Sequence, residues 1–374
     1  MQEAKSKIRD TRYEILVWLP SPVGDAVLAT PALRALRRYF KSSRICYYTS
    51  DDIRQVLSPT NLNDTWIEQR DANPFMIAGK LRRHKFTHAI LMKNSLGSAL
   101  AVWLAGIPSR TGYVRDGRGL LLNSRLYPSR LPGGKFKPAS MIDYYLAIAR
   151  RLGADTNDRR LELLVDHKEH ANLMAKLPEL ASCSRPITVI IPGAGFGPSK
   201  CWPAQRFAKV ADWLIDRYNH AVVISAAPNA LERAIAQKVS AFSRHGLISL
   251  AEKPLNLGEL KALLSICNLV ITNDTGPRHI AIALGRKVVT VFGPNDQAWT
   301  DTGYEDEIRI AGNAVCAPCN RPTCGKSQHL CMEAITVEMV CDAVQRLSEQ
   351  RTRTGITNER IPHNCAEGRL KKLS

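Results

Sequence analysis

The stretch Ile187-Thr-Val-Ile-Ile-Pro-Gly-Ala-Gly-Phe-Gly-Pro-Ser-Lys200 decides the fold of this chain. An apolar, β-branched run gives way to a glycine-rich loop, and a helical pattern follows over residues 207–218. Such an apolar run is typical of a strand that is buried on both faces, as in parallel sheets covered by helices. Strand, loop and helix in this order predict a parallel βαβ unit.

The same alternation extends in both directions from this stretch. We expect further strands at 13–19, 44–49, 87–92, 110–114, 221–225, 247–250, 269–272 and 287–292. Helices are expected at 26–39, 96–105, 140–152, 231–242, 257–267, 278–284 and 337–348. The sequence therefore predicts an α/β protein with two Rossmann-like domains, which face each other across a cleft that holds the active site.

The boundaries follow from composition. We expect an N-terminal domain at residues 12–165, a C-terminal domain at 185–348, and a polar, mobile tail at 349–374. The polar segment 155–184 is interpreted as the connection between the domains, with a short strand near 161–165. A length of 374 residues agrees with two domains.

The chain is basic, and the charge is concentrated in its first part. The net charge is +18, and residues 1–150 hold 24 Lys or Arg against 11 Asp or Glu. This bias favours an anionic partner: a nucleic acid, an acidic membrane surface or a phosphorylated substrate. No aromatic stacking motif or reading helix for nucleic acid is evident, so we expect no nucleic-acid partner. No apolar run is long enough to span a bilayer and the N-terminus is polar, which predicts a cytoplasmic protein.

Three loops follow expected strand ends. In the first, Gly24 permits a sharp turn and Asp25 opens a helix. Asp25 either caps that helix or acts as a general base, and the motif alone does not choose between these roles. The second loop contains three glycines and Lys200. These residues could bind an anion, although their spacing matches no named phosphate-binding motif. The third, Asn273-Asp-Thr-Gly-Pro-Arg-His279, breaks a strand and starts a helix whose N-terminus can hold a diphosphate.

Taken together and in this order, the loops resemble those of glycosyltransferase family 9, the heptosyltransferases, and most nearly the heptosyltransferase II branch. The stretches that carry the resemblance begin at Pro20, Asn94, Ala105, Pro192 and Thr272, the last continuing to Phe292-Gly-Pro294. The resemblance covers about residues 14–348. It implies a GT-B fold and inverting transfer of a heptose from ADP-heptose to the inner core of lipopolysaccharide, with a lipid A–Kdo–heptose acceptor.

The resemblance also implies roles for single residues. Asp25 would be the catalytic base, and Lys200 would pair with the donor diphosphate. The other residues expected to bind the donor are Gly195, Phe196, Leu255, Asp274, Thr275, Gly276 and His279, with Leu255 against the adenine. No catalytic metal or cofactor is required in this scheme, because loop amides, a helix dipole and Lys200 would stabilise the leaving ADP.

Two departures from the family pattern leave alternatives open. Cys201 follows Lys200 where many relatives carry a polar residue, and the acidic ribose contact expected just after Pro228-Asn229 is absent. Glu232 would have to replace that contact. A GT-B transferase or an epimerase acting on another nucleotide sugar is therefore the alternative function.

The basic first half is expected to meet a phosphorylated lipid acceptor peripherally, at the inner face of the inner membrane. Arg34, Arg37 and Arg38 on one helix, and the run Arg82-Arg83-His84-Lys85, are the expected contacts with lipid headgroups.

Ten cysteines occur, and four of them cluster as Cys316-x2-Cys319-x4-Cys324-x6-Cys331, with His329 nearby. Short C-x2-C spacing in a chain without an export signal favours a structural zinc ion over disulfides. The alternative is a metal-free loop near the acceptor. The expected metal takes no part in the chemistry, so chelation should lower stability more than it changes donor affinity.

Overall fold

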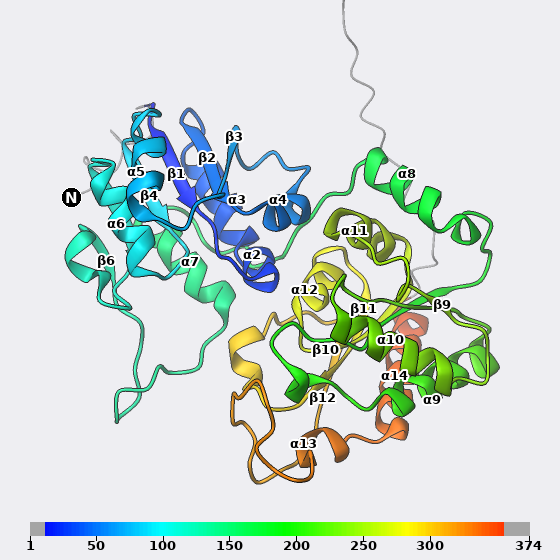
Figure 1. The fold of residues 1–374 in the computed structure, drawn as a ribbon. Coiled ribbons are helices and arrows are strands. Elements are labelled where there is room, and N and C mark those ends of the chain that lie inside the picture. Colours follow the sequence, from blue (N-terminus) through cyan, green and yellow to red (C-terminus); the bar gives the residue numbers. More distant parts are fainter. Residues whose placement is uncertain (1–11, 355–374) are drawn as a thin grey trace, which may run out of the picture.

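The computed structural model describes residues 12–354, and it contains two parallel six-stranded sheets (Figure 1). The first sheet has the order β3-β2-β1-β4-β5-β6, and the second has the order β12-β11-β10-β7-β8-β9. The strands are β1 (Glu14–Trp18), β2 (Arg44–Thr49), β3 (Thr65–Glu68), β4 (His88–Leu91), β5 (Ser109–Tyr113), β6 (Ser124–Leu126), β7 (Ile187–Ile191), β8 (Ala221–Ile224), β9 (Ile248–Ser249), β10 (Leu269–Asn273), β11 (Lys287–Phe292) and β12 (Glu307–Ala311). The predicted pair of Rossmann-like sheets is confirmed.

Helices cover both faces of each sheet. They are α2 (Val23–Leu28), α3 (Thr30–Tyr39), α4 (Asp51–Leu57), α5 (Pro74–Arg82), α6 (Leu96–Leu104), α7 (Met141–Arg151), α8 (His167–Lys176), α9 (Ala204–Tyr218), α10 (Ala230–Phe242), α11 (Leu257–Ile266), α12 (Gly276–Ala283), α13 (Leu330–Glu333) and α14 (Val337–Thr354), with short 3-10 turns η1 (Arg118–Leu121), η2 (Pro178–Leu180), η3 (Pro198–Lys200) and η4 (Gln297–Thr300). Strand β1 is central and almost fully buried, as the apolar run at 14–18 requires.

Two expectations about the elements are wrong. The helix expected at 26–39 is two helices, because Pro31 lacks an amide hydrogen and the chain turns at Ala29, where the Thr30 hydroxyl donates to the Val27 carbonyl over 2.8 Å. Residues 161–165 form no strand. Helix α8 stands in the expected connection instead, started by a capping box between Asp166 and Glu169.

The tail expected from residue 349 begins later than predicted, because α14 continues to Thr354. The rest of that tail, residues 355–374, lies outside the described residues.

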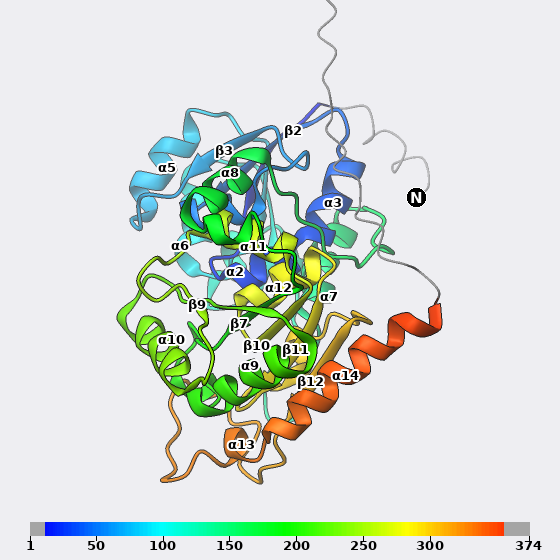
Figure 2. The same ribbon diagram turned by 90° about the vertical axis from the view of Figure 1, so that its right-hand side faces the viewer.

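The two domains touch through helices rather than through their sheets. Both views show α2 of the first domain beside α12 of the second (Figures 1 and 2). A continuous cluster of buried apolar side chains extends from α2 and α3 across this junction to α11 and α12. Helix α8 packs on α11, so the chain has already joined the second domain there, before the first strand of that domain begins.

A buried lysine makes a second connection between the domains. Lys261 of α11 is fully buried, and its ammonium donates to the carbonyls of Val56 and Ser58 at the end of α4. The carboxylate of Glu169 in α8 forms an ion pair with the same ammonium at 2.9 Å. The Lys261 charge therefore joins α8, α11 and the C-terminus of α4.

Candidate active site

The three predicted loops meet at the contact between α2 and α12. Each loop follows the carboxyl end of a central strand: β1, β7 or β10. Parallel strands present these ends at one edge of their sheet, so the two sheets bring the loops to the junction from opposite sides. The prediction that these loops share one site is supported by the contacts described below.

Two glycines allow the helix ends to approach closely. A Cβ on Gly24 would stand 2.9 Å from Cδ2 of His279, and one on Gly276 would stand 3.2 Å from Cβ of Val23. Neither position leaves room for a larger residue without movement. The glycines of the first and third loops are therefore required by packing between the domains.

Asp25 lies in this contact, in the first turn of α2. Helix α2 has no side-chain cap, so the capping role considered for Asp25 is not what the structure shows. Burial raises the pKa of the Asp25 carboxyl to about 6, and no charged or hydrogen-bonding group among residues 12–354 counteracts the shift. A carboxylate with this pKa is suited to accept a proton near neutral pH.

Asp274 lies on the other side of the contact and has the opposite surroundings. Its Oδ2 accepts a 2.6 Å ion pair from Nζ of Lys200, and its Oδ1 lies 3.2 Å from Arg278 and 3.3 Å from the Thr300 hydroxyl. Burial opposes ionisation of this carboxyl, but Lys200 and Arg278 outweigh burial and lower its pKa. Asp274 is therefore ionised at neutral pH.

Lys200 is only 8% exposed and ends the glycine-rich loop. Its ammonium also donates to the Asp274 carbonyl at 2.9 Å and lies 5.0 Å from the centre of the Phe196 ring. The residue predicted to face a diphosphate thus already holds the second and third loops together. An ammonium has three donors, and two of them serve Asp274.

Asn273, Arg278 and Glu307 support this arrangement, although none of them was among the predicted site residues. Asn273 is fully buried, and its amide donates to the carbonyls of Pro192 and Gly193 at 2.7 and 3.2 Å. Arg278 is also buried and forms a two-point ion pair with Glu307 at 2.6 and 2.9 Å. Asn273 lies inside the third-loop motif quoted from the sequence, whereas no local residue pattern indicates the Arg278–Glu307 pair.

The remaining predicted donor residues divide by exposure. Gly195 and Phe196 are exposed at the tip of the glycine-rich loop, where a Cβ on Gly195 would meet nothing. Thr275 stands at the N-cap of α12 and makes no capping bond, so its hydroxyl is available. Leu255 is 6% exposed and belongs to the apolar core. The contact of Leu255 with the adenine stays a prediction.

His279 is buried at 3% exposure against Gly24, and its Nδ1 has no hydrogen-bond partner among the described residues. Burial, followed by the Arg278 charge, lowers the pKa of this imidazole to about 3. His279 is therefore neutral at physiological pH and can offer a ligand a hydrogen bond but no positive charge.

Glu232 lies where the replacement ribose contact was expected. It sits in the first turn of α10, and its carboxylate accepts a 3.2 Å bond from the Ala227 amide. The same carboxylate fills the space that a Cβ on Gly193 would occupy. Glu232 is thus at the carboxyl ends of β7 and β8, beside the glycine-rich loop.

A polar group of the first domain lies beyond the carboxyl ends of β4 and β5. The Arg118 guanidinium donates to Oδ1 of Asn94 at 2.8 Å, and the Tyr144 hydroxyl donates to the same oxygen at 3.1 Å. Arg115 lies over the Phe136 ring at 4.1 Å, and its buried Nε has no partner among the described residues. Tyr145, next to Tyr144, is buried, and the charges of Asp25 and Arg115 both affect the pKa of its hydroxyl.

The basic residues proposed to meet lipid headgroups do not form one free patch. Arg34 is 7% exposed and paired with Asp158 at 3.1 Å and Glu162 at 2.9 Å. Arg37 is paired with Asp64 at 2.8 Å. Those two residues stabilise the fold, so the expectation for this helix is wrong except at exposed Arg38. The run at 82–85 is exposed as predicted.

Three of the four clustered cysteines, Cys316, Cys319 and Cys324, lie in a loop that contacts the glycine-rich loop, and Cys331 lies in α13. The Ser199 amide donates to the Pro322 carbonyl at 3.1 Å, and the Ser199 hydroxyl donates to the Arg321 carbonyl at 2.6 Å. Within residues 12–354, no three His, Cys, Asp or Glu side chains stand close enough to share a metal ion. All nine cysteines of this part of the chain are free thiols.

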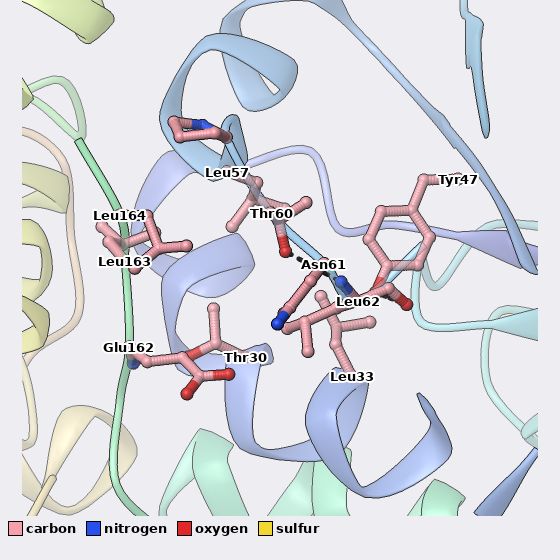
Figure 3. Close-up of a pocket in the computed structure, with 11 residues that line it drawn as sticks. Thr30, Leu33, Tyr47, Leu57, Thr60, Asn61, Leu62, Glu162, Leu163 and Leu164 are labelled. Atoms are coloured by element: carbon pink, nitrogen blue, oxygen red, sulfur yellow. Dashed lines mark hydrogen bonds between the residues drawn. The ribbon is translucent and has the colours of Figure 1, made fainter. Parts of the chain in front are cut away.

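A separate cavity of about 120 Å³ lies away from this junction (Figure 3). Leu33 of α3, Tyr47 of β2, the turn at Thr60–Leu62 and the connecting segment at Glu162–Leu164 line it. It contains none of the predicted site residues. Among the described residues, no helix is both long and apolar enough to cross a bilayer.

Comparison with known proteins agrees with this geometry. The model of glycosyltransferase family 9 (heptosyltransferase) matches residues 75–329. Lipooligosaccharide heptosyltransferase 2 of Haemophilus influenzae is 32% identical over 59% of this chain and 64% of its own length. The enzyme of the same name from Campylobacter jejuni serotype O:6 is 25% identical over 90% of this chain and 99% of its own length.

A solved structure of a relative has the same fold. The chain superposes on the E. coli ADP-heptose lipopolysaccharide heptosyltransferase II with a TM-score of 0.73 and 25% identity, over 91% of this chain and 99% of that one. The two facing sheets are thus those of the GT-B fold, as predicted. Because the family model matches more than half of its length, this chain belongs to glycosyltransferase family 9.

Proposed function

We propose that this enzyme transfers a heptose from ADP-heptose to a heptose of the lipopolysaccharide inner core, on a lipid A–Kdo–heptose acceptor, with inversion at the anomeric carbon. The observation that carries the proposal is the pair of carboxylates across the α2–α12 contact. Asp25 has no ion-pair partner within residues 12–354 and its pKa is raised to about 6, whereas Asp274 is paired and its pKa is lowered. Relatives named heptosyltransferase 2 support the choice of sugar and acceptor.

The step assigns the proton to Asp25. The acceptor hydroxyl attacks the anomeric carbon of the donor, and the Asp25 carboxylate takes the hydroxyl proton. A new C–O bond forms as the bond between the anomeric carbon and the diphosphate breaks. The electron pair of that bond leaves with ADP. One displacement of this kind gives the inverted anomer.

The second domain stabilises the leaving group. The third ammonium hydrogen of Lys200, the Thr275 hydroxyl, which makes no capping bond, and the N-terminus of α12 all stand beside Asp274. A cation and unsatisfied helix amides favour the negative charge that develops on the diphosphate. Glu232 is placed to accept a hydrogen bond from the ribose hydroxyls, beside the glycine-rich loop.

The first domain offers an anion site on the acceptor side. Arg115, with its unpartnered Nε, and the Arg118–Asn94–Tyr144 group lie on the same side as Asp25. An acceptor that carries carboxylates or phosphates near its reactive hydroxyl matches these donors.

Mass spectrometry with purified enzyme tests the proposal. Incubation with ADP-heptose and a deacylated Kdo–heptose acceptor should add one heptosyl residue and release ADP, and NMR of the product should show the inverted anomer. Asp25→Asn should give no comparable product, whereas Asp52→Asn, which changes an exposed carboxylate of the same domain, should behave as wild type. Turnover only with another nucleotide sugar, or conversion of a donor without an acceptor, would favour the alternative transferase or epimerase.

Peripheral membrane binding is part of the same proposal. The exposed residues Arg83 and Lys85 follow α5, and Arg82 donates to the Leu104 carbonyl, next to half-exposed Trp103. Basic residues beside an exposed indole suit the interface of an anionic bilayer. Flotation with vesicles containing anionic lipid should show salt-sensitive binding that Arg83→Glu with Lys85→Glu weakens. Equal binding to neutral vesicles would contradict this placement.

A further inference from the structure

The strongest feature that the proposed chemistry does not use is a stretch of the first domain at residues 72–142. It holds twelve Lys or Arg and a single acidic residue, Asp116. Every large apolar side chain that is exposed between residues 12 and 154 lies in the same stretch: Phe75, Met76, Leu96, Trp103, Leu120, Tyr127 and Leu131. Exposed apolar side chains are ordinary when scattered, but gathered beside basic residues they indicate a surface for a partner that is both apolar and anionic.

Five of these side chains belong to α5, α6 and η1, which form one outer layer. The two helices begin together, since a Cβ on Gly97 would stand 3.6 Å from Cγ of Pro74. They also end together, where the Arg82 guanidinium donates to the Leu104 carbonyl over 2.6 Å. The turn η1 packs on α6 and adds Leu120, which is 88% exposed. Figure 1 shows α5 and α6 on the side of the first domain that is turned away from the second domain.

The outward side of this layer is apolar at one end and basic at the other. The inward side chains of both helices pack in the core on one face of the first sheet. Phe75 and Met76, in the first turn of α5, and Leu96, in the first turn of α6, are at least half exposed. Beyond the other end of α5, Arg83 and Lys85 are exposed. This division suits the boundary of a bilayer, where apolar side chains enter the acyl region and basic ones meet the headgroups.

The apolar end lies at the same edge of the first sheet as Asp25. Helix α5 follows β3, α6 follows β4 and η1 follows β5, just as α2 follows β1. In a parallel sheet the first turn after each strand lies at the carboxyl edge, which is where ligands bind. A bilayer against the apolar end would therefore bring a lipid-linked acceptor to the edge that holds Asp25.

We propose that the outward surface of α5, α6 and η1 docks on an anionic bilayer, with Phe75, Met76, Leu96 and Leu120 inserted among the acyl chains. The peripheral binding described above needs only headgroup contacts. Insertion adds a fixed orientation, in which the carboxyl edge of the first sheet faces the membrane. The apolar contact should persist at salt concentrations that screen the basic residues. The delivery of a lipid-linked acceptor rests on the proposed function, whereas the docking itself does not.

Hydrogen exchange on vesicles locates the surface. Vesicles of phosphatidylethanolamine and phosphatidylglycerol should slow exchange in α5, α6 and η1, and should leave α10 of the second domain unchanged. Slowed exchange confined to another face of the molecule would overturn the proposal.

Paired substitutions measure the apolar contribution. Phe75→Ser with Met76→Ser keeps the net charge and changes two exposed side chains, so the fold should be retained. This variant should partition about tenfold less into the same vesicles and should lose the binding that wild type keeps at high salt. Leu231→Ser with Phe242→Ser, at two exposed apolar positions of α10, should bind as wild type. Equal binding of wild type and the α5 variant would overturn the proposal.

Activity separates docking from chemistry. The α5 variant should use a deacylated acceptor as wild type does, whereas transfer to a lipid-linked acceptor in vesicles should fall about tenfold. A dimer in vesicle-free solution that protects the same residues would also overturn the proposal, because a second copy would then cover this surface. If wild type used neither acceptor, the proposed function would fail, while vesicle binding and exchange would still decide the inference.

Discussion

The two sides of the α2–α12 contact differ in how their charges are satisfied. On the second domain, Lys200, Asp274, Arg278 and Glu307 form one chain of ion pairs. On the first domain, Asp25 is desolvated and has no such partner in the part of the chain that the structure describes. Paired charges hold their protonation state over a wide pH range, whereas an unpaired buried carboxyl titrates near neutrality. This difference agrees with the proposed roles, which are ligand binding on the paired side and proton transfer on the unpaired side.

The largest expected effect comes from removing the unpaired carboxylate. Asp25→Asn should lower turnover by ~10²–10⁴-fold and leave ADP affinity nearly unchanged, because the base acts only on the acceptor proton. Burial of Asp25 disfavours its charge, so the neutral amide should also raise the melting temperature at pH 7. Steady-state kinetics, ADP titration and thermal melts measure these effects. Near-normal turnover in a folded variant would remove Asp25 from catalysis.

The next largest effect is expected from a substitution on the paired side of the contact. Lys200→Ala should weaken ADP binding by ~10–100-fold and adenosine binding much less, since only ADP carries the charge that the ammonium meets. Calorimetry with both ligands measures the difference. Lys209→Ala, at an exposed position on α9, is the matched control. Equal loss for ADP and adenosine would assign Lys200 to loop folding alone.

A pH series compares the two carboxylates directly. The pKa of Asp25 is raised to about 6 and the pKa of Asp274 is lowered, so only Asp25 changes charge between pH 5 and 7. Turnover should fall about tenfold per pH unit below 6, while ADP affinity stays flat. The pH dependence of stability runs in the opposite direction to that of turnover. The folded state favours protonated Asp25, so its contribution is present near pH 4 and is lost as pH rises through 6. A flat rate profile from pH 5 to 7 would contradict this assignment.

The smallest effect tests the distance between the two sides. Gly24→Ala would place a methyl group 2.9 Å from the His279 ring, so the helix ends must separate slightly. We expect a few-fold loss of turnover, with ADP affinity maintained. Gly79→Ala, at a position with nothing within 4 Å, is the control. Unchanged turnover in Gly24→Ala would show that the α2–α12 contact tolerates displacement.

The central strands were predictable from sequence because burial on both faces leaves an uninterrupted apolar run, as at 187–191. The edge strands β3 and β12 escaped prediction because they are only partly buried and therefore carry polar residues. Helix α8 is polar as well, although its capping box, Asp166 with Glu169, was a readable signal.

The loops of the site could be located from sequence, but their pairing could not. Lys200 and Asp274 are 74 residues apart, and the Arg278–Glu307 pair joins an apolar helix to an unpredicted strand. The neutral state of His279 depends on burial against Gly24 of the other domain. These properties arise from tertiary contacts, which local residue patterns do not encode.

The buried lysine between the domains has a consequence for protein engineering. A chimera would combine the N-terminal domain of one relative, proposed to bind the acceptor, with the C-terminal domain of another, proposed to bind the donor. Here, a crossover placed after α8 would separate Glu169 from Lys261 and leave a buried ammonium without its carboxylate. A crossover within 153–165 keeps that pair, but the new acceptor domain must still present the carbonyls at the end of α4. Domain exchange should therefore succeed only where donor domain, α8 and a compatible α4 are chosen as one unit.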